Sequence, residues 1–153
     1  MAAGTLEVVH LLLSLGASAS RTRFGHDALQ IVVSDEESAF EDATVRLAAA
    51  RMLIQHGASL DKRNEHGWSR LYVAAFEGDV GAVQALVALG GDPNDEPPPL
   101  AAACWGTGDD PASTTGIIDA LVGTAPDLAG PGGITALMLA AGDGALVAVE
   151  ALL

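Results

Sequence analysis

Apolar residues recur every three or four positions in several short stretches of the chain, and these stretches end alike. EVVHLLLSLGAS (7–18), AARMLIQHGAS (49–59) and AVQALVALGGD (82–92) each close with a pair of aliphatic residues, two further residues and a glycine. Such spacing places the apolar side chains on one face of an α-helix that stops near the glycine. We therefore expect short helices over these segments.

A second pattern alternates with the first. GHDALQIVV (25–33), GWSRLYVAA (67–75), PPPLAAAC (97–104) and GITALMLAA (133–141) each contain a turn, a leucine and then small or aliphatic residues. The closing glycines Gly16, Gly57 and Gly90 lie 41 and 33 residues apart, and Ala125 takes the same position 35 residues after Gly90. A unit of about 33 residues with one turn and two short helices has the period of an ankyrin repeat.

The copies resemble the ankyrin-repeat motif Gly-x-Thr-Pro-Leu-His-x-Ala-Ala. The best match consists of Gly133, Thr135, Ala136, Leu137, Met138, Ala140 and Ala141, and the next of Gly67, Ser69, Leu71, Tyr72, Ala74 and Ala75. The motif histidine is replaced by Gln30, Tyr72, Ala101 and Met138 in the successive copies. The resemblance covers almost the whole chain and implies an all-α solenoid of stacked helix-turn-helix units with protruding β-turn or hairpin fingers.

We expect one ankyrin-repeat domain over residues 1–153, with a half repeat at 1–18 and repeats at about 19–59, 60–92, 93–127 and 128–153. Gly78 and Gly4 lie eight residues before the aliphatic residues Leu86 and Leu12, so both are expected between the two helices of a repeat. Both ends of such an array would present apolar faces. This predicts further ankyrin repeats or an effector domain in a longer chain, or a partner that covers the ends.

Two repeats depart from the regular period. About nine extra residues separate the helices of the second repeat, within an acidic insertion at 34–44 that surrounds Phe40. It is either a solvated loop or helical extension, or an acidic arm for a basic partner. The fourth repeat has a shortened turn with three prolines, Pro97 to Pro99, and extra residues between its helices, so it should be the least regular.

Charge narrows the class of partner. The chain has 7 Lys and Arg against 20 Asp and Glu, for a net charge of −13. Residues 1–75 contain all 7 bases and 9 acids (7 − 9 = −2), and residues 76–153 contain 11 acids and no base (−11). An acidic surface repels phosphate backbones and anionic lipid. We therefore expect neither nucleic acid nor a membrane as partner.

Little in the sequence points to chemistry. One cysteine, Cys104, excludes an internal disulfide, and a reducing compartment, cytoplasmic or nuclear, is the natural expectation. The histidines are scattered without metal-ligand spacing, and the adjacent Asp109 and Asp110 have diverging side chains. No nucleophile, base and orienting group can be assembled. We therefore expect no enzyme activity, no metal and no cofactor.

Trp68 is the residue that most calls for an explanation, because it follows a turn glycine where nothing obvious would bury it. In ankyrin repeats this position points out of the finger and varies with the partner, so the resemblance implies partner contact there. Trp, Phe and Arg are enriched at binding hot spots, and two neighbouring fingers should together form a basic and aromatic patch on an otherwise acidic molecule. The expected protein-binding residues on two fingers and the adjoining first helix are Arg23, Phe24, His26, Arg63, Glu65, His66, Trp68, Val73, Phe76 and Glu77. The alternative is that Trp68 folds back and covers its own hairpin.

The resemblance implies a non-catalytic protein–protein interaction module that binds another protein through finger tips and the concave first-helix face. The charge and composition also allow a structural spacer or scaffold segment with an acidic, solubilising surface. The partner protein is not specified by any residue.

Overall fold

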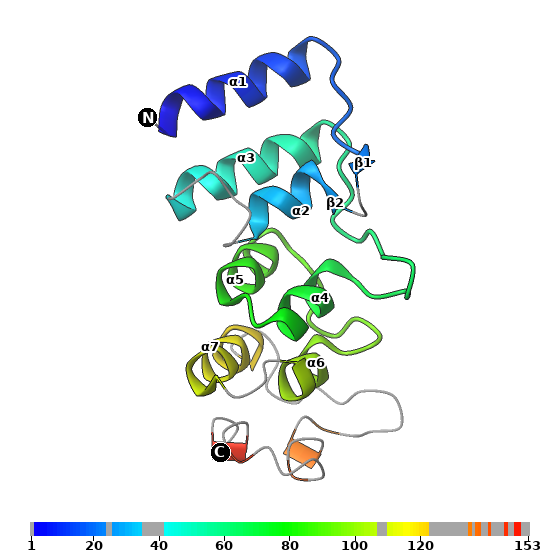
Figure 1. Cartoon of the computed structure of the whole chain (residues 1–153), viewed down its shortest axis with the longest axis vertical. Coiled ribbons are helices and arrows are strands. Elements are labelled where there is room, and N and C mark those ends of the chain that lie inside the picture. The colour runs from blue at the N-terminus through cyan, green and yellow to red at the C-terminus, as the bar shows by residue number, and fades with distance from the viewer. Residues whose placement is uncertain are drawn as a thin grey trace. The chain divides into compact units, whose positions relative to one another are not determined.

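Figure 1 shows the computed structural model of the chain, in which short helices follow one another in pairs. The structure describes residues 2–23, 26–34, 42–106 and 110–122, together with 135, 137–138, 141, 146 and 149–150. Residues 1–62 and 63–153 form two compact units, and each is described by itself.

The first unit contains three helices and a small hairpin within its described ranges. Its elements are α1 (Ala2–Ser14), β1 (Thr22–Arg23), β2 (His26–Asp27), α2 (Ala28–Val33) and α3 (Ala43–Gln55). Helix α3 packs against both α1 and α2, and the core includes Leu13, Leu29, Val33, Ala50 and Leu53. The antiparallel pairing of β1 and β2 forms the first predicted finger, because it closes a hairpin just before α2.

The second unit stacks like helices on like. Its helices in the described ranges are α4 (Arg70–Glu77), α5 (Val80–Ala88), α6 (Pro99–Gly106) and α7 (Pro111–Val122). The first helices α4 and α6 pack together, and so do the second helices α5 and α7 (Figure 1).

Buried alanines are concentrated on the first helices of this unit, and larger buried aliphatic side chains lie on the second helices. The buried residues of α4 and α6 include Ala74, Ala75, Ala101, Ala102 and Ala103, and those of α5 and α7 include Val83, Leu86, Ile117, Ile118 and Leu121. Alanines let first helices approach closely, while branched side chains fill the layer between second helices to native density.

The second helices α1, α3 and α5 end as the sequence predicts, and the fourth predicted end, at Ala125, lies outside the described residues. The closing glycines Gly16, Gly57 and Gly90 have φ angles of 88°, 94° and 96°. At the last of them, the amide of Gly90 donates to the carbonyl of Val87 at 3.0 Å and that of Gly91 to the carbonyl of Leu86 at 2.9 Å. These bonds satisfy carbonyls at the helix end, and a positive φ costs glycine least.

The junctions between helices are predicted correctly at one position and wrongly at another. Gly78 ends α4 in a left-handed conformation, with φ of 80°. Gly4 lies inside α1, which begins at Ala2, so the expected junction there is wrong. The error arose because spacing from the aliphatic pair was the only signal for Gly4.

The second repeat accommodates part of its insertion as helix. Helix α3 begins at Ala43, ten residues before Leu53 (53 − 43), whereas α5 begins at Val80, six residues before Leu86 (86 − 80). Four inserted residues therefore extend the helix. The acidic residues at 35–41, with Phe40, lie outside the described residues.

Helix α1 exposes the apolar face that the sequence predicts for the start of the array. Val8, Leu11 and Leu12 are exposed on it, and so is Leu15 directly after the helix. The opposite end of the array, at residues 151–153, lies outside the described residues.

Ser69 is the N-cap of α4, at the junction between the second finger and this helix, and its contribution to stability can be measured. Its buried side-chain oxygen accepts the backbone N–H of Tyr72 at 3.2 Å. Ser69→Ala should lower the free energy of unfolding by about 1 kcal/mol, because a buried donor loses its partner. Ser69→Thr keeps the acceptor and serves as the matched control. Chemical denaturation measures both, and an unchanged midpoint for Ser69→Ala would show that the cap contributes nothing.

Asp110 gives the fold a specific response to acid. Its pKa is lowered by a hydrogen bond from the side chain of Ser113 and by the backbone N–H groups of Ala112 and Ser113. A lowered folded-state pKa stabilises the fold above the unfolded value of 3.8, and this contribution disappears as pH falls through the folded pKa. In an NMR titration of the carboxyl carbons, Ser113→Ala should raise the pKa of Asp110. A pKa that stays lowered in that variant would rule out Ser113 as its main cause.

Candidate protein-binding surface

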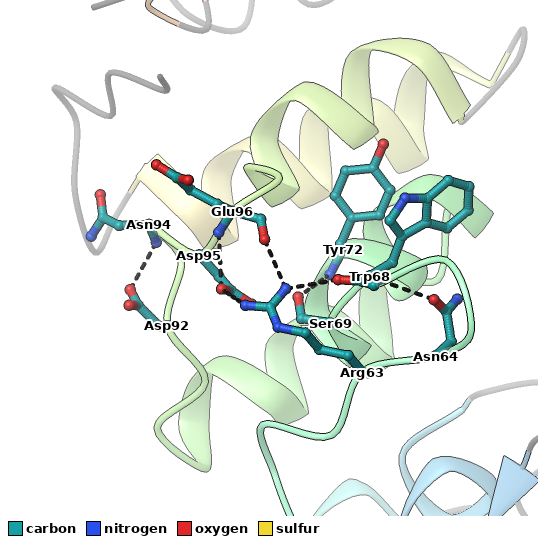
Figure 2. A network of polar contacts seen from close by, with 10 residues as sticks. Arg63, Asn64, Trp68, Ser69, Tyr72, Asp92, Asn94, Asp95 and Glu96 are labelled. Atoms are coloured by element: carbon teal, nitrogen blue, oxygen red, sulfur yellow. Dashed lines mark hydrogen bonds and ion pairs between the residues drawn. The ribbon is translucent and has the colours of Figure 1, made fainter. Parts of the chain in front are cut away.

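The second finger is a tight hairpin built around Asn64. Arg63 and Ser69 form an antiparallel bridge, and the backbone N–H of Asn64 donates to the carbonyl of Trp68 at 3.0 Å. The side-chain oxygen of Asn64 accepts the backbone N–H groups of His66 and Trp68, each at 3.0 Å. One asparagine therefore fixes the turn that carries Trp68 (Figure 2).

Four rings extend from this finger onto α4, and three of them, His66, Tyr72 and Phe76, each contact the fourth, Trp68. The centroid of the Trp68 ring lies 5.1 Å from His66, 5.0 Å from Tyr72 and 5.8 Å from Phe76, with tilts near 41°. These are favourable spacings for aromatic pairs. Tyr72 and Phe76 are four positions apart on α4, which brings their rings to one side of the helix, and Trp68 precedes the helix on the finger. We call these four residues the aromatic row.

The aromatic row is buried at one ring and open at the others. Tyr72 is 5% exposed, and burial raises the pKa of its hydroxyl. Phe76 is 39% exposed, the His66 side chain 63%, and Trp68 is half-buried. Trp68 thus covers Tyr72 and keeps an accessible surface, while its contact with a partner stays a prediction.

Arg63 ties this finger to the following turn. Its guanidinium donates to the carbonyls of Gly67 at 2.8 Å and Glu96 at 2.7 Å, and it forms an ion pair with the carboxylate of Asp95 (Figure 2). The turn is itself ordered by its carboxylates, since Asp92 accepts the N–H of Asn94 at 2.8 Å and Asp95 that of Glu96 at 2.9 Å. Arg63 therefore holds two neighbouring fingers of this unit in register.

These contacts change the charge expected for the second finger. The sequence suggested a basic and aromatic surface, but the charge of Arg63 is offset by Asp95 and Arg70 is only 6% exposed. Glu65 beside His66 and Glu77 beside Phe76 are both exposed. The surface around the aromatic row is therefore aromatic and acidic.

The other predicted binding residues are distributed as follows. Val73 lies half-buried on α4, and His26 is exposed on the first finger opposite Arg23. Phe24 and the side chain of Arg23 lie outside the described residues. All ten predicted binding residues remain predictions as partner contacts.

The first finger is anchored by a buried ion pair. The ammonium of Lys62 lies 3.2 Å from the carboxylate of Asp27, which is 1% exposed and also accepts the N–H of Gln30 to cap α2. A buried carboxylate needs such partners to remain charged. The only lysine of the chain thus joins the segment after α3 to the first finger at the start of α2.

Sequence reasoning missed three partners in this surface. Tyr72 was noted only as a motif replacement, although its spacing of four from both Trp68 and Phe76 was a usable signal. The roles of Asp95 and Glu96 as acceptors for Arg63 had no local signal, because the contact spans more than thirty residues.

No group of three or more His, Cys, Asp or Glu side chains is placed to hold a metal ion within the part of the chain that the structure describes. Among the same residues, no helix is long and apolar enough to cross a membrane.

Comparison with known proteins gives the family. A model of three copies of ankyrin repeats matches residues 1–97. The chain belongs to the ankyrin-repeat family. The family's members are generally non-catalytic modules that bind other proteins.

Individual relatives agree with the family match. The human ankyrin repeat domain-containing protein 63 is 34% identical over an alignment of 123 residues that covers 72% of this chain and 30% of that protein. The ankyrin repeat protein nuc-2 of Neurospora crassa is 32% identical over an alignment of 97 residues that covers 60% of this chain and 8% of that protein. The chain thus spans less than a third of the length of these relatives.

A solved structure confirms the fold. The crystal structure of an ankyrin repeat domain from Acinetobacter baumannii AYE superposes with a TM-score of 0.68 and 25% identity, covering 98% of this chain and 75% of that one. The predicted fold class, stacked helix-turn-helix repeats with protruding fingers, is correct. The single domain over residues 1–153 stays a prediction.

The contacts of Arg63 can be measured by a double-mutant cycle. Arg63→Ala should lower the free energy of unfolding by about 1 kcal/mol and speed amide exchange at 92–97, because two carbonyls and a carboxylate lose a donor at a partly exposed site. Asp95→Asn removes the charge of the ion pair, and the double variant Arg63→Ala, Asp95→Asn closes the cycle. If amide exchange at 92–97 were the same in Arg63→Ala and wild type, the two fingers would not be coupled through Arg63.

Proposed function

We propose that this ankyrin-repeat domain is a non-catalytic interaction module that binds another protein through its finger tips and the first-helix face, with the aromatic row as the main contact in the second unit. The observation that carries this proposal is the partial exposure of three rings held in fixed positions. Phe76, Trp68 and His66 offer aromatic surface on a finger that Asn64 and Arg63 make rigid. Rigid aromatic anchors are typical of binding hot spots.

Support for binding rather than catalysis comes from the uses of the polar groups. In the second unit, Ser69 and Asp79 accept backbone N–H groups at the starts of α4 and α5, and Arg63 joins two fingers. None of these contacts joins a nucleophile to a base that a third group orients, which is the arrangement that covalent catalysis needs. The proposed partner is a protein, and the acidic charge argues against nucleic acid.

Photo-crosslinking tests the proposed surface without removing its aromatic character. Phe76 is replaced by p-benzoyl-phenylalanine, and the domain is exposed to a lysate of the cells that produce it. The matched control carries the same group at Gln84, which is exposed on the second helix α5. We expect a specific protein adduct from position 76 only. Adducts of equal yield from both positions, or from neither, would favour a spacer with no binding face.

Alanine variants then separate binding from folding. Trp68→Ala should weaken binding of the captured protein by about 2 kcal/mol, the scale of a hot spot, and should also destabilise the fold because its ring contacts three others. Phe76→Ala is the sharper test, since the ring is 39% exposed and contributes less to the core. It should reduce affinity while the melting temperature changes little. A large fall in melting temperature with unchanged affinity would assign Phe76 to packing alone.

A further inference from the structure

The aromatic row lies in a unit with a strong excess of negative charge. Between Arg63 and Val122, leaving aside residues 107–109, the structure describes eight acidic side chains against two basic ones. The eight are Glu65, Glu77, Asp79, Asp92, Asp95, Glu96, Asp110 and Asp119, and all are at least partly exposed.

Both basic side chains of this segment are already engaged. Arg63 bridges two fingers through Gly67, Asp95 and Glu96. Arg70 is 6% exposed and takes part in interactions of its own. The remaining electrostatic potential at the surface of this segment is therefore negative, and a cation from outside meets no competing positive side chain that is fully exposed.

The ends of the aromatic row carry the acids that matter most. Glu65 precedes His66 in the chain, and its carboxylate lies 3.9 Å from the imidazole. Glu77 follows Phe76 and is exposed. An arginine or lysine side chain can lay its apolar stem on Trp68 and Phe76, place its charge against the ring faces, and remain within reach of a carboxylate.

We propose that the aromatic row, with Glu65 and Glu77 at its ends, docks a basic segment of the partner protein, with an arginine or lysine side chain seated against Trp68. This inference rests on the proposed function and adds the chemistry of the partner. Charge complementarity selects this occupant. An acidic segment would be repelled, and a purely apolar segment would gain no electrostatic attraction from Glu65 and Glu77.

Synthetic peptides test the chemistry without knowledge of the natural partner. The probe is a short fluorescein-labelled peptide of Gly, Ser and Leu with arginine at every third position. Its controls carry glutamine or glutamate at the same positions. Fluorescence polarisation gives the affinity, and the indole N–H signals of ¹⁵N-labelled protein show which of Trp68 and Trp105 responds. We expect only the arginine peptide to bind and only the Trp68 signal to shift.

Two variants, each with a matched control, locate the contact. Trp68→Leu keeps an apolar side chain but removes the ring face, and it should weaken the arginine peptide by about three- to thirtyfold. Trp68→Phe keeps a ring and should weaken it less. Glu65→Gln should weaken binding by about two- to fivefold at low salt, whereas Asp119→Asn, an equal change of charge on α7, should have less effect.

The outcomes separate this inference from the proposed function. Equal binding of the glutamine peptide would overturn the basic specificity, and so would equal effects of Glu65→Gln and Asp119→Asn, which indicate diffuse attraction to an acidic chain. Absence of binding by the arginine peptide at millimolar concentration would also overturn it. In each of these cases a specific crosslink from position 76 would still support the proposed binding module. Absence of that crosslink would contradict both the binding module and its basic specificity.

Discussion

The helices of this chain are too short to be stable alone, so every other feature depends on their burial against like helices. Helix α4 has eight residues and α5 nine, below the length at which an isolated helix persists in water. Each gains stability by packing on its counterpart in the next repeat. Since Leu86, Ile117 and Leu121 are almost fully buried in this way, the core of this unit is built mainly by its helices.

The turn tips are ordered although they add little to this core. The second finger is ordered by local polar contacts from Asn64, and Arg63 joins it to the next turn. These bonds lie at or near the surface, where each contributes little to the stability of the whole domain. Their effect is instead to fix where Trp68 stands relative to α4, which lowers the entropic cost of binding.

The sequence predicted the repeated part of the structure better than the particular part. Gly57, Gly90 and Gly78 were correctly placed because each lies at a fixed distance from an aliphatic pair of its repeat. Gly4 was placed by the same count and lies inside α1, since a count alone does not show whether a first helix precedes it. The start of α3 at Ala43 was equally beyond the period, because an insertion has no counterpart in the other repeats.

The binding surface shows the same limit in a different way. The residue types at positions 63–77 were enough to identify an unusual finger, but they gave no sign that an ion pair offsets the charge of Arg63. Its acceptors are the carbonyl of Glu96 and the carboxylate of Asp95, more than thirty residues away. A repeat protein brings such distant residues together through stacking alone. The chemistry of one finger is therefore decided by the next repeat, and a surface that is basic in the isolated motif becomes acidic in the array.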